Sequence, residues 1–221
     1  MSKISAIIVA AGEGKRFGAF KQHVLLKGKP VLDWCLETFE THSKISEIIL
    51  VLRKGELEGK LFRHYKKISA IAQGGKKRQD SVVAGFKHID PKGTEIVLVH
   101  DGARPLVGKH LIDSVIEAVK VHGAAIPVIP IEDTVKRIER QKVKGTEERS
   151  VLFRAQTPQG FAYHVLKEAL EKACMEGRLG TDEAFLVEQT GRDVFIVRGE
   201  RRNIKITSPE DLKIAEALLE D

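Results

Sequence analysis

Apolar residues in this sequence occur in short runs that alternate with longer segments of helical periodicity. The runs are continuous and of strand length, which is typical of strands covered on both faces. They span Ile4–Ala10, Glu47–Leu52, Ile68–Ala72, Glu95–Val99, Ala124–Val128 and Asp193–Val197. The helical patterns span Pro30–Thr41, Glu56–Tyr65, Arg78–His88, Lys109–His122, Tyr163–Glu176, Thr181–Gln189 and Pro209–Leu219. The alternation predicts an α/β fold built on a mainly parallel, doubly wound sheet.

One region, residues 131–154, departs from this alternation. Thr134–Glu139 and Arg149–Phe153 each alternate apolar with polar side chains, about a charged centre that contains Gly145. This pattern predicts the two strands of a protruding β-hairpin arm. Because a polar two-stranded hairpin is only marginally stable alone, we expect it to rest on the domain surface or on a second subunit. No low-complexity linker divides the 221 residues, so we expect a single domain that carries this arm.

The charge balance narrows the class of partner. Lys and Arg number 37 against 31 Asp and Glu, a net charge of +6, which favours anionic partners such as nucleotides, sugar phosphates or nucleic acid. Aromatic residues make up only 5% of the chain, so stacking platforms for single-stranded nucleic acid are scarce. A nucleic-acid-binding protein is therefore an alternative that net charge alone supports, and we expect no nucleic-acid partner.

The cysteines and the apolar runs indicate the compartment. Cys35 and Cys174 stand far apart, without a Cys or His at ligand spacing, which fits neither a disulfide framework nor a zinc site. No apolar run reaches the roughly 20 residues that a membrane helix needs. We therefore expect a cytoplasmic protein without a membrane partner.

A glycine-rich loop follows the first predicted strand and reads AAGEGKRFG from Ala10 to Gly18. Its glycines allow a sharp turn that points backbone N–H groups at an anion, and Lys15 and Arg16 add positive charge. The loop lacks the G-K-[ST] of a Walker A motif, and Phe17 stands where a dinucleotide fingerprint needs its third glycine. A nucleoside triphosphate site beyond the strand ends is favoured, and a tight turn with solvated basic residues is the alternative.

Two further segments place charge after predicted strands. VHDGARP puts Asp101 and Arg104 at a strand's carboxyl end, where the acid could hold a metal or substrate hydroxyls and the guanidinium could bind phosphate. The two side chains could equally bridge each other. GGKKRQDS, residues 74–81, joins glycines and positive charge to a helix start, as an anion site or as a flexible basic loop.

Weaker signals come from three segments and one histidine. Gln156–Gly160 and Gly180–Glu183 are typical of turns and helix starts. Asn203–Thr207 predicts a short strand whose Lys205 points to water. His100 is expected to be packed or hydrogen-bonded rather than catalytic.

Taken in order, the segments VAAGEGKRFG, FKQ, GGKKRQDSV, VHDGARP, EDTVKR, R-x7-TPQ, TDEA and NIKIT resemble those of the 2-C-methyl-D-erythritol 4-phosphate cytidylyltransferases of the non-mevalonate isoprenoid pathway. The resemblance runs from Ile4 to Leu219. It implies a Rossmann-like nucleotidyltransferase fold, a homodimer formed through the arm, and transfer of a cytidylyl group from CTP to methylerythritol phosphate with release of pyrophosphate. A cytidylyltransferase for another polyol phosphate, such as ribitol 5-phosphate, is the nearest alternative.

The resemblance also implies roles for individual residues. It implies Arg16 and Lys21 as catalytic cations. Around CTP it implies Ala10, Ala11, Gly12, Gly14, Gly75, Ser81 and Asp101. Around the polyol phosphate it implies Arg104, Thr134, Arg149, Thr181 and Lys205, with Thr134 and Arg149 delivered to the neighbouring subunit's site. The chain departs from the family pattern in the short segment between Arg16 and Lys21, at Phe20, and at Lys76, whose position is often acidic.

The chemistry of such a reaction suits these residue types. The attacking phosphate oxygen is already ionised at neutral pH, so the reaction needs no strong general base. Catalysis then rests on positioning and on charge stabilisation by Arg16, Lys21 and a Mg²⁺ that bridges triphosphate oxygens, with Asp101 as the expected protein ligand.

Overall fold

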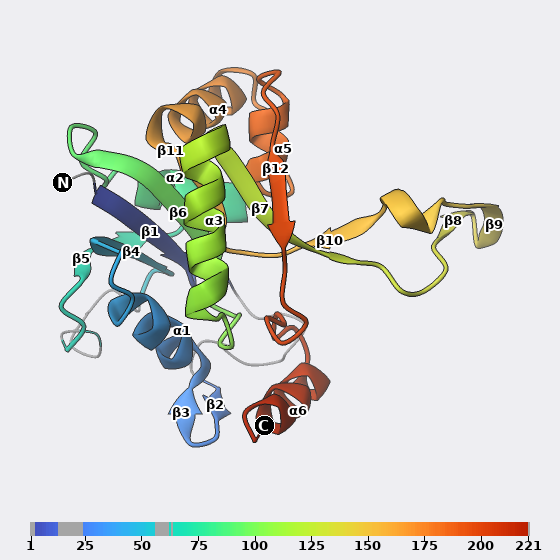
Figure 1. Cartoon of the computed structure of the whole chain (residues 1–221), viewed down its shortest axis with the longest axis horizontal. Helices are drawn as coiled ribbons and strands as arrows, with labels where there is room; N and C mark the ends of the chain where they lie inside the picture. Colours follow the sequence, from blue (N-terminus) through green and yellow to red (C-terminus); the bar gives the residue numbers. More distant parts are fainter. Residues whose placement is uncertain (1–2, 13–23, 56–61, 63, 221) are drawn as a thin grey trace.

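The computed structural model of the chain describes residues 3–12, 24–55, 62 and 64–220. Its strands are β1 (Lys3–Val9), β2 (Leu25–Leu26), β3 (Lys29–Pro30), β4 (Glu47–Leu52), β5 (Ile68–Gln73), β6 (Thr94–Asp101), β7 (Ala124–Pro130), β8 (Lys136–Glu139), β9 (Lys142–Thr146), β10 (Phe153–Ala155), β11 (Gln159–Ala162) and β12 (Phe195–Arg198). Its helices are α1 (Val31–Glu40), α2 (Arg78–Phe86), α3 (Lys109–His122), α4 (Tyr163–Met175), α5 (Glu183–Glu188) and α6 (Pro209–Leu218), with a 3-10 turn, η3, at Arg149–Val151. Figure 1 shows a central sheet with helices around it and an arm that carries β8 and β9 away from it.

The central sheet follows the order β10-β7-β11-β6-β1-β4-β5, and β12 pairs with β7. β1 runs parallel to β4 and β6, β4 to β5, and β12 to β7. The predicted α/β class with a mainly parallel sheet is confirmed. The register places Val9 of β1 opposite Asp101 of β6, so the loops that follow these two strands leave from the same edge.

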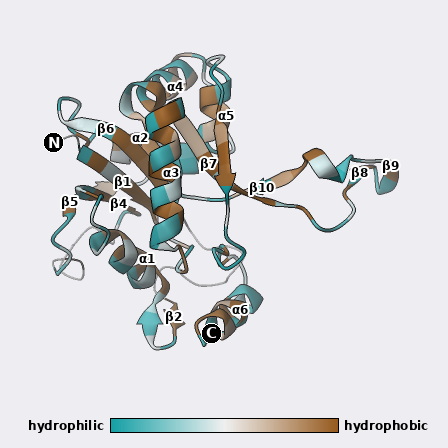
Figure 2. Cartoon of the chain, in the orientation of Figure 1, coloured by the Kyte–Doolittle hydropathy of each residue, from teal (hydrophilic) through white to brown (hydrophobic). Residues whose placement is uncertain are grey.

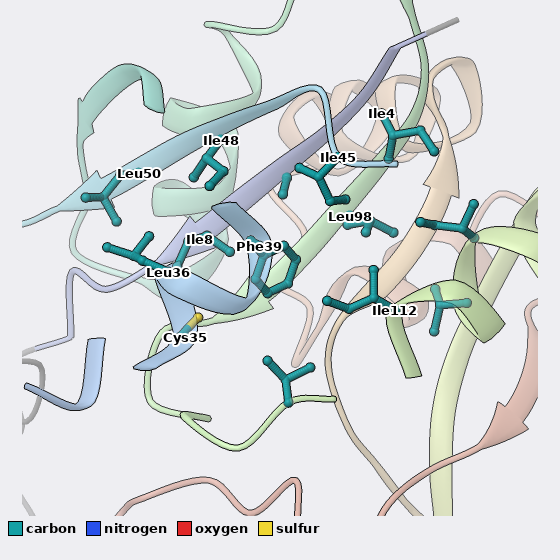
Figure 3. Close-up of a cluster of buried hydrophobic side chains, with 14 of the residues drawn as sticks. Ile4, Ile8, Cys35, Leu36, Phe39, Ile45, Ile48, Leu50, Leu98 and Ile112 are labelled. Carbon is teal, nitrogen blue, oxygen red and sulfur yellow. The ribbon is translucent and has the colours of Figure 1, made fainter. Parts of the chain in front are cut away.

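Helices cover both faces of the sheet because successive strand side chains enter two different buried clusters. Ile8 of β1 packs in one cluster with Phe39 of α1 and Ile112 of α3, as Figure 3 shows. The neighbouring Ile7 lies in the other cluster, with side chains of α2, α4 and α5. Full burial of one such side chain contributes roughly 1.5–3 kcal/mol, so both clusters stabilise the doubly wound arrangement.

A third, smaller cluster attaches the C-terminal helix near the segment that contains Lys205. Leu26 of β2, Ile206 and Ala215 of α6 are buried together in it. The predicted short strand at Asn203–Thr207 is wrong, because this segment has no regular secondary structure. It is tied to a loop instead of a strand: the Ile206 N–H donates to the Ala103 carbonyl oxygen at 2.8 Å.

The sequence reading missed strand β11, which it took for part of a turn. β11 lies between β6 and β7 and is antiparallel to both. Thr157 and Pro158 precede it and are joined by a cis peptide bond. The proline in this segment is the reason why the sequence predicts a turn here. Gly160 makes the strand possible, because a Cβ there would lie 2.6 Å from Val115 and 2.8 Å from Val119 of α3.

Gly160→Ala is expected to destabilise the protein by about 1–3 kcal/mol, the usual effect of overpacking a filled core. Urea unfolding measures this free energy. Gly93→Ala is the matched control, since its Cβ would meet only ordinary contacts, the nearest at 3.5 Å from Asp90. Equal stability of the two variants would contradict the close packing of β11 on α3.

Several predicted boundaries shift. The helix expected over Thr181–Gln189 begins at Glu183, because Asp182 is its N-cap and accepts a hydrogen bond from the Phe185 N–H at 2.9 Å. The helix expected over Glu56–Tyr65 falls mostly on positions that the structure does not describe. None of the helices in the described ranges is long and apolar enough to cross a membrane.

The arm contains a hairpin, but its return strand differs from the predicted one. β8 pairs with β9, whereas Arg149–Val151 forms the 3-10 turn and Phe153–Ala155 is β10, antiparallel to β7. The chain reverses at Arg140 and Gln141, which adopt φ values of 46° and 63°. Two-residue hairpin turns favour this left-handed backbone and usually contain Asn-Gly, so Arg140-Gln141 is not a pattern that predicts such a turn.

Candidate active site

Three loops meet at the carboxyl edge of the parallel strands. The Gly102 N–H donates to the Val9 carbonyl oxygen at 2.9 Å, and the Gly74 N–H donates to the Leu52 carbonyl oxygen at 2.7 Å. A Cβ on Gly74 would lie 2.2 Å from the Cβ of Ala11, so only glycine allows these two backbones to approach. The segment 10–12, the loop 74–77 and the loop after Asp101 therefore share one edge, where α/β proteins bind ligands.

Asp101 is the centre of this edge and faces three cationic side chains. Its Oδ1 lies 3.0 Å from Arg78 Nε, and its Oδ2 lies 2.8 Å from Lys205 Nζ and 3.7 Å from Arg104 Nε. Burial alone would raise the pKa of Asp101, but these cations outweigh it and hold the pKa below its usual range. The carboxylate is therefore ionised at neutral pH. The structure brings Asp101, Arg104 and Lys205 together, and the expectation that Lys205 points to water is wrong.

Arg104 is also held by a hydrogen bond to the backbone of Asn203. One terminal nitrogen donates to the Asn203 carbonyl oxygen at 2.8 Å, and burial lowers the pKa of the guanidinium although Asp101 opposes this. Its buried Nε has no hydrogen-bond partner in the described part of the chain. This Nε faces the Asp101 carboxylate at 3.7 Å, which is too long for a hydrogen bond, so the two groups interact through their opposite charges.

His100 and Thr157 fix the backbone of Asp101. The Asp101 N–H donates to Thr157 Oγ1 at 3.1 Å, that oxygen lies 3.0 Å from His100 Nδ1, and His100 Nε2 lies 3.3 Å from the Arg104 carbonyl oxygen. Since a carbonyl oxygen only accepts, Nε2 carries the ring proton and Nδ1 accepts from the Thr157 hydroxyl. Burial lowers the pKa of His100 to about 3, so the ring is neutral. The packed and hydrogen-bonded His100 is confirmed.

The loop that precedes α2 is closed by Ser81. Its Oγ donates to the Lys77 carbonyl oxygen and accepts from the Gly75 N–H, both at 3.2 Å. The predicted pair Gly75 and Ser81 is thus one local unit, while Lys76 is exposed beside it.

The segment around Thr181 is tied to the same edge. Thr181 itself is exposed, and Glu183, which begins α5, is 1% exposed and accepts two hydrogen bonds from Arg78, at 2.7 and 2.8 Å. Glu183 and Asp101 together hold the pKa of Arg78 above its usual range, although burial opposes this. Sequence reasoning missed this role of Arg78 and Glu183. The sequence contained one signal for this pair: Glu183 stands beside the apolar residues Ala184, Leu186 and Val187. An acid that is buried with them requires a cation as its partner.

The remaining predicted residues lie on the arm, directly after β1, or outside the described residues. Thr134 and Arg149 are exposed on the arm, which projects away from the sheet in Figure 1, and Arg149 donates a hydrogen bond to the Glu132 carbonyl oxygen. One chain therefore does not bring them to Asp101. Ala10, Ala11 and Gly12 directly follow β1. Gly14, Arg16 and Lys21 fall outside the described residues.

The described residues do not fit a divalent cation held by protein ligands. Within the ranges that the structure covers, no group of three or more His, Cys, Asp or Glu side chains could hold one. Both oxygens of Asp101 already face cations. Asp101 is therefore not favoured as the predicted metal ligand, and phosphate oxygens of a bound triphosphate would have to supply the ligands.

Comparisons with known proteins agree over almost the whole chain. The family model for IspD, 2-C-methyl-D-erythritol 4-phosphate cytidylyltransferase, matches residues 4–221. Enzymes of that name from Alkaliphilus metalliredigens and Bacillus licheniformis are each 44% identical, over 99% and 97% of this chain and 93% and 94% of their own lengths. The crystal structure of the Thermus thermophilus enzyme has a TM-score of 0.84 and 34% identity, covering 99% of this chain and 100% of that one. The structure of the 4-diphosphocytidyl-2C-methyl-D-erythritol synthase of Anaerococcus prevotii has a TM-score of 0.87 at 34% identity, covering 100% and 99%.

Proposed function

This chain belongs to the family of 2-C-methyl-D-erythritol 4-phosphate cytidylyltransferases, and we propose that it transfers the cytidylyl group of CTP to methylerythritol phosphate in isoprenoid precursor synthesis. The products are 4-diphosphocytidyl-2-C-methyl-D-erythritol and pyrophosphate. The observation that carries the proposal is the buried Asp101 with Arg78, Arg104 and Lys205 at the sheet edge where the loops meet. The relatives named above give no support to a ribitol 5-phosphate enzyme.

The reaction needs charge and orientation more than proton transfer. A phosphate oxygen of methylerythritol phosphate attacks the α-phosphorus of CTP, a new P–O bond forms, and the bond to the β-phosphate breaks to release pyrophosphate. The nucleophile is already ionised, so the neutral, buried His100 need not act as a base. Positioning and charge neutralisation supply the catalysis.

The site residues divide between the two substrates. Lys205, whose side chain is 39% exposed, and Arg104 bind the polyol phosphate together with Thr181. The ionised Asp101 accepts hydrogen bonds from substrate hydroxyls. Around CTP stand Ala10, Ala11, Gly12, Gly14, Gly75 and Ser81, and Arg16 and Lys21 neutralise the phosphates at the reacting centre.

The arm completes the site from a second subunit. Ile138, Val143, Val151 and Phe153 are 57%, 63%, 71% and 46% exposed on it, and Figure 2 shows hydrophobic residues along this projection. Exposed apolar side chains on a polar arm favour a covering surface, and a second copy of the chain supplies one in a two-fold homodimer. In that dimer Thr134 and Arg149 reach the partner's polyol phosphate. We place the enzyme in the cytoplasm, where the free Cys35 and the exposed, free Cys174 stay reduced.

Pyrophosphate release tests the activity. The purified protein is incubated with each of the four common nucleoside triphosphates and with methylerythritol phosphate or ribitol 5-phosphate. We expect release with CTP and methylerythritol phosphate only. Equal release with UTP would contradict the base assignment, and faster release with ribitol 5-phosphate would contradict the substrate.

Excess chelator is expected to abolish turnover, because Mg²⁺ enters with CTP as its complex and reduces the charge of the triphosphate. The same assay with and without EDTA measures this, and added Mg²⁺ should restore the rate. Full activity in EDTA would refute the requirement. Unfolding temperatures that are equal in the two conditions are the control, because a cation carried by CTP does not stabilise the free protein.

A further inference from the structure

The first two residues of α2 join the nucleotide loop to the segment that carries Thr181. Gln79 Nε2 donates to the Arg178 carbonyl oxygen at 3.0 Å, and its Oε1 accepts from the Gly180 N–H at 2.8 Å. Arg78, one residue earlier, donates to Asp101 and to both oxygens of Glu183. Thr181 is therefore held on both sides by neighbouring side chains.

These contacts fix the position and the direction of the groups that Arg78 and Gln79 bind. The side-chain amide of Gln79 uses its donor and its acceptor on one short stretch of backbone, which sets both the distance and the direction of that stretch. Arg78 uses Nε for one carboxylate and a terminal nitrogen for the other, and the planar guanidinium fixes the angle between them. Both residues begin the helix that follows Gly75.

We propose that Arg78 and Gln79 are positioning residues: they fasten Thr181 and Asp101, on the polyol phosphate side, to the loop that holds the nucleotide. They act through the residues they hold and not by touching the reacting atoms. This inference deepens the proposed function and rests on it. Its consequence is selective, because loss of the Gln79 contacts frees the 178–180 backbone while Gly75 and Ser81 keep their own hydrogen bonds.

Gln79→Ala tests the backbone contacts without changing charge. We expect the KM for methylerythritol phosphate to rise roughly five- to twentyfold, the range for losing one or two hydrogen bonds, with the KM for CTP changed less than about twofold. Arg178→Ala is the matched control. It removes a side chain from the same stretch, whose contacts are with Glu176 and Gln189, and leaves the carbonyl oxygen that Gln79 binds. A fall in unfolding temperature with both KM values unchanged, or equal rises in both, would overturn the proposal.

Arg78→Lys tests the guanidinium contacts to Asp101 and Glu183, since a single ammonium keeps the charge but cannot reproduce the contacts to both carboxylates. We expect kcat/KM for methylerythritol phosphate to fall about tenfold or more. Because this variant leaves the buried Glu183 poorly paired, the double variant Arg78→Lys/Glu183→Gln separates stability from positioning. Its unfolding temperature should recover while the kinetic defect persists. Recovery of both would show that Arg78 serves stability alone.

The activity of the unaltered protein tests the proposed function separately from the positioning role of Arg78 and Gln79. If it releases pyrophosphate only from CTP and methylerythritol phosphate, the proposed function stands whatever the variants do. The inference then depends on the variants alone. CTP binding measured by calorimetry without the second substrate should be equal in the unaltered protein and in Gln79→Ala, and a large loss would contradict the selective role.

Discussion

Lys21→Ala and Arg16→Ala should each lower kcat by roughly two to three decades, the effect of removing one preorganised group that stabilises charge in a transition state. The reason is that negative charge develops on the phosphate oxygens while the new bond to the α-phosphorus forms and the bond to the β-phosphate breaks, and these cations stabilise it. In the sequence both residues follow Val9, whose strand β1 ends opposite Asp101 of β6. Their own placement lies outside the described residues, so this prediction rests on the sequence and on the family.

Steady-state kinetics at saturating CTP and methylerythritol phosphate measure the effect. Thermal unfolding of each variant is the control for folding. A rise in the KM for CTP with kcat unchanged would mean that the cation binds the ground state and the transition state equally well, which contradicts a catalytic role.

Mixing two inactive variants should restore activity if the arm serves the partner's site. Each site would take Lys21 from one subunit and Arg149 from the other. Lys21→Ala and Arg149→Ala homodimers then carry one lesion in every site, whereas their heterodimer has one site with both lesions and one with neither. With random exchange, about half of the dimers are mixed and half of their sites are intact, so activity should reach about a quarter of the unaltered rate.

We expect this result because Arg149 and Asp101 lie in different parts of the same chain. Arg149 is exposed on the arm and donates to the Glu132 carbonyl oxygen, while Asp101 lies at the sheet edge. Exchange must be demonstrated with tagged subunits. If exchange occurs and no activity returns, both residues serve the same subunit's site, and the shared-site proposal fails.

The contacts of Asp101 show which parts of the site the residue pattern predicted and which it did not. Its position after a buried strand, with Arg104 three residues later, predicted an acid and a cation at the carboxyl edge. Lys205 lay in a segment without regular structure, and only the family resemblance pointed to it. Arg78 and Glu183 are 105 positions apart, and no local pattern pairs them.

The class of the fold and the edge where the site forms follow from the residue pattern. Continuous apolar runs of strand length between helical patterns are typical of strands covered on both faces, and the loops that follow parallel strands lie together at one edge of the sheet. Family membership also follows from segments spread over the whole chain. These are properties of neighbouring residues or of their order.

The position of β11, the turn of the arm and the set of cations that face Asp101 depend instead on contacts between distant parts of the chain. β11 is stabilised by its pairing with β6 and β7 and by the room that Gly160 leaves against α3, whereas its local signal was that of a turn. The hairpin reverses at Arg140 and Gln141 because the pairing of β8 with β9 outweighs their poor preference for a left-handed backbone. The ammonium group of Lys205 lies 2.8 Å from Asp101 because the buried carboxylate attracts it. Each outcome depends on groups that are distant in sequence, and long-range packing and electrostatics therefore fixed what local preference left open or opposed.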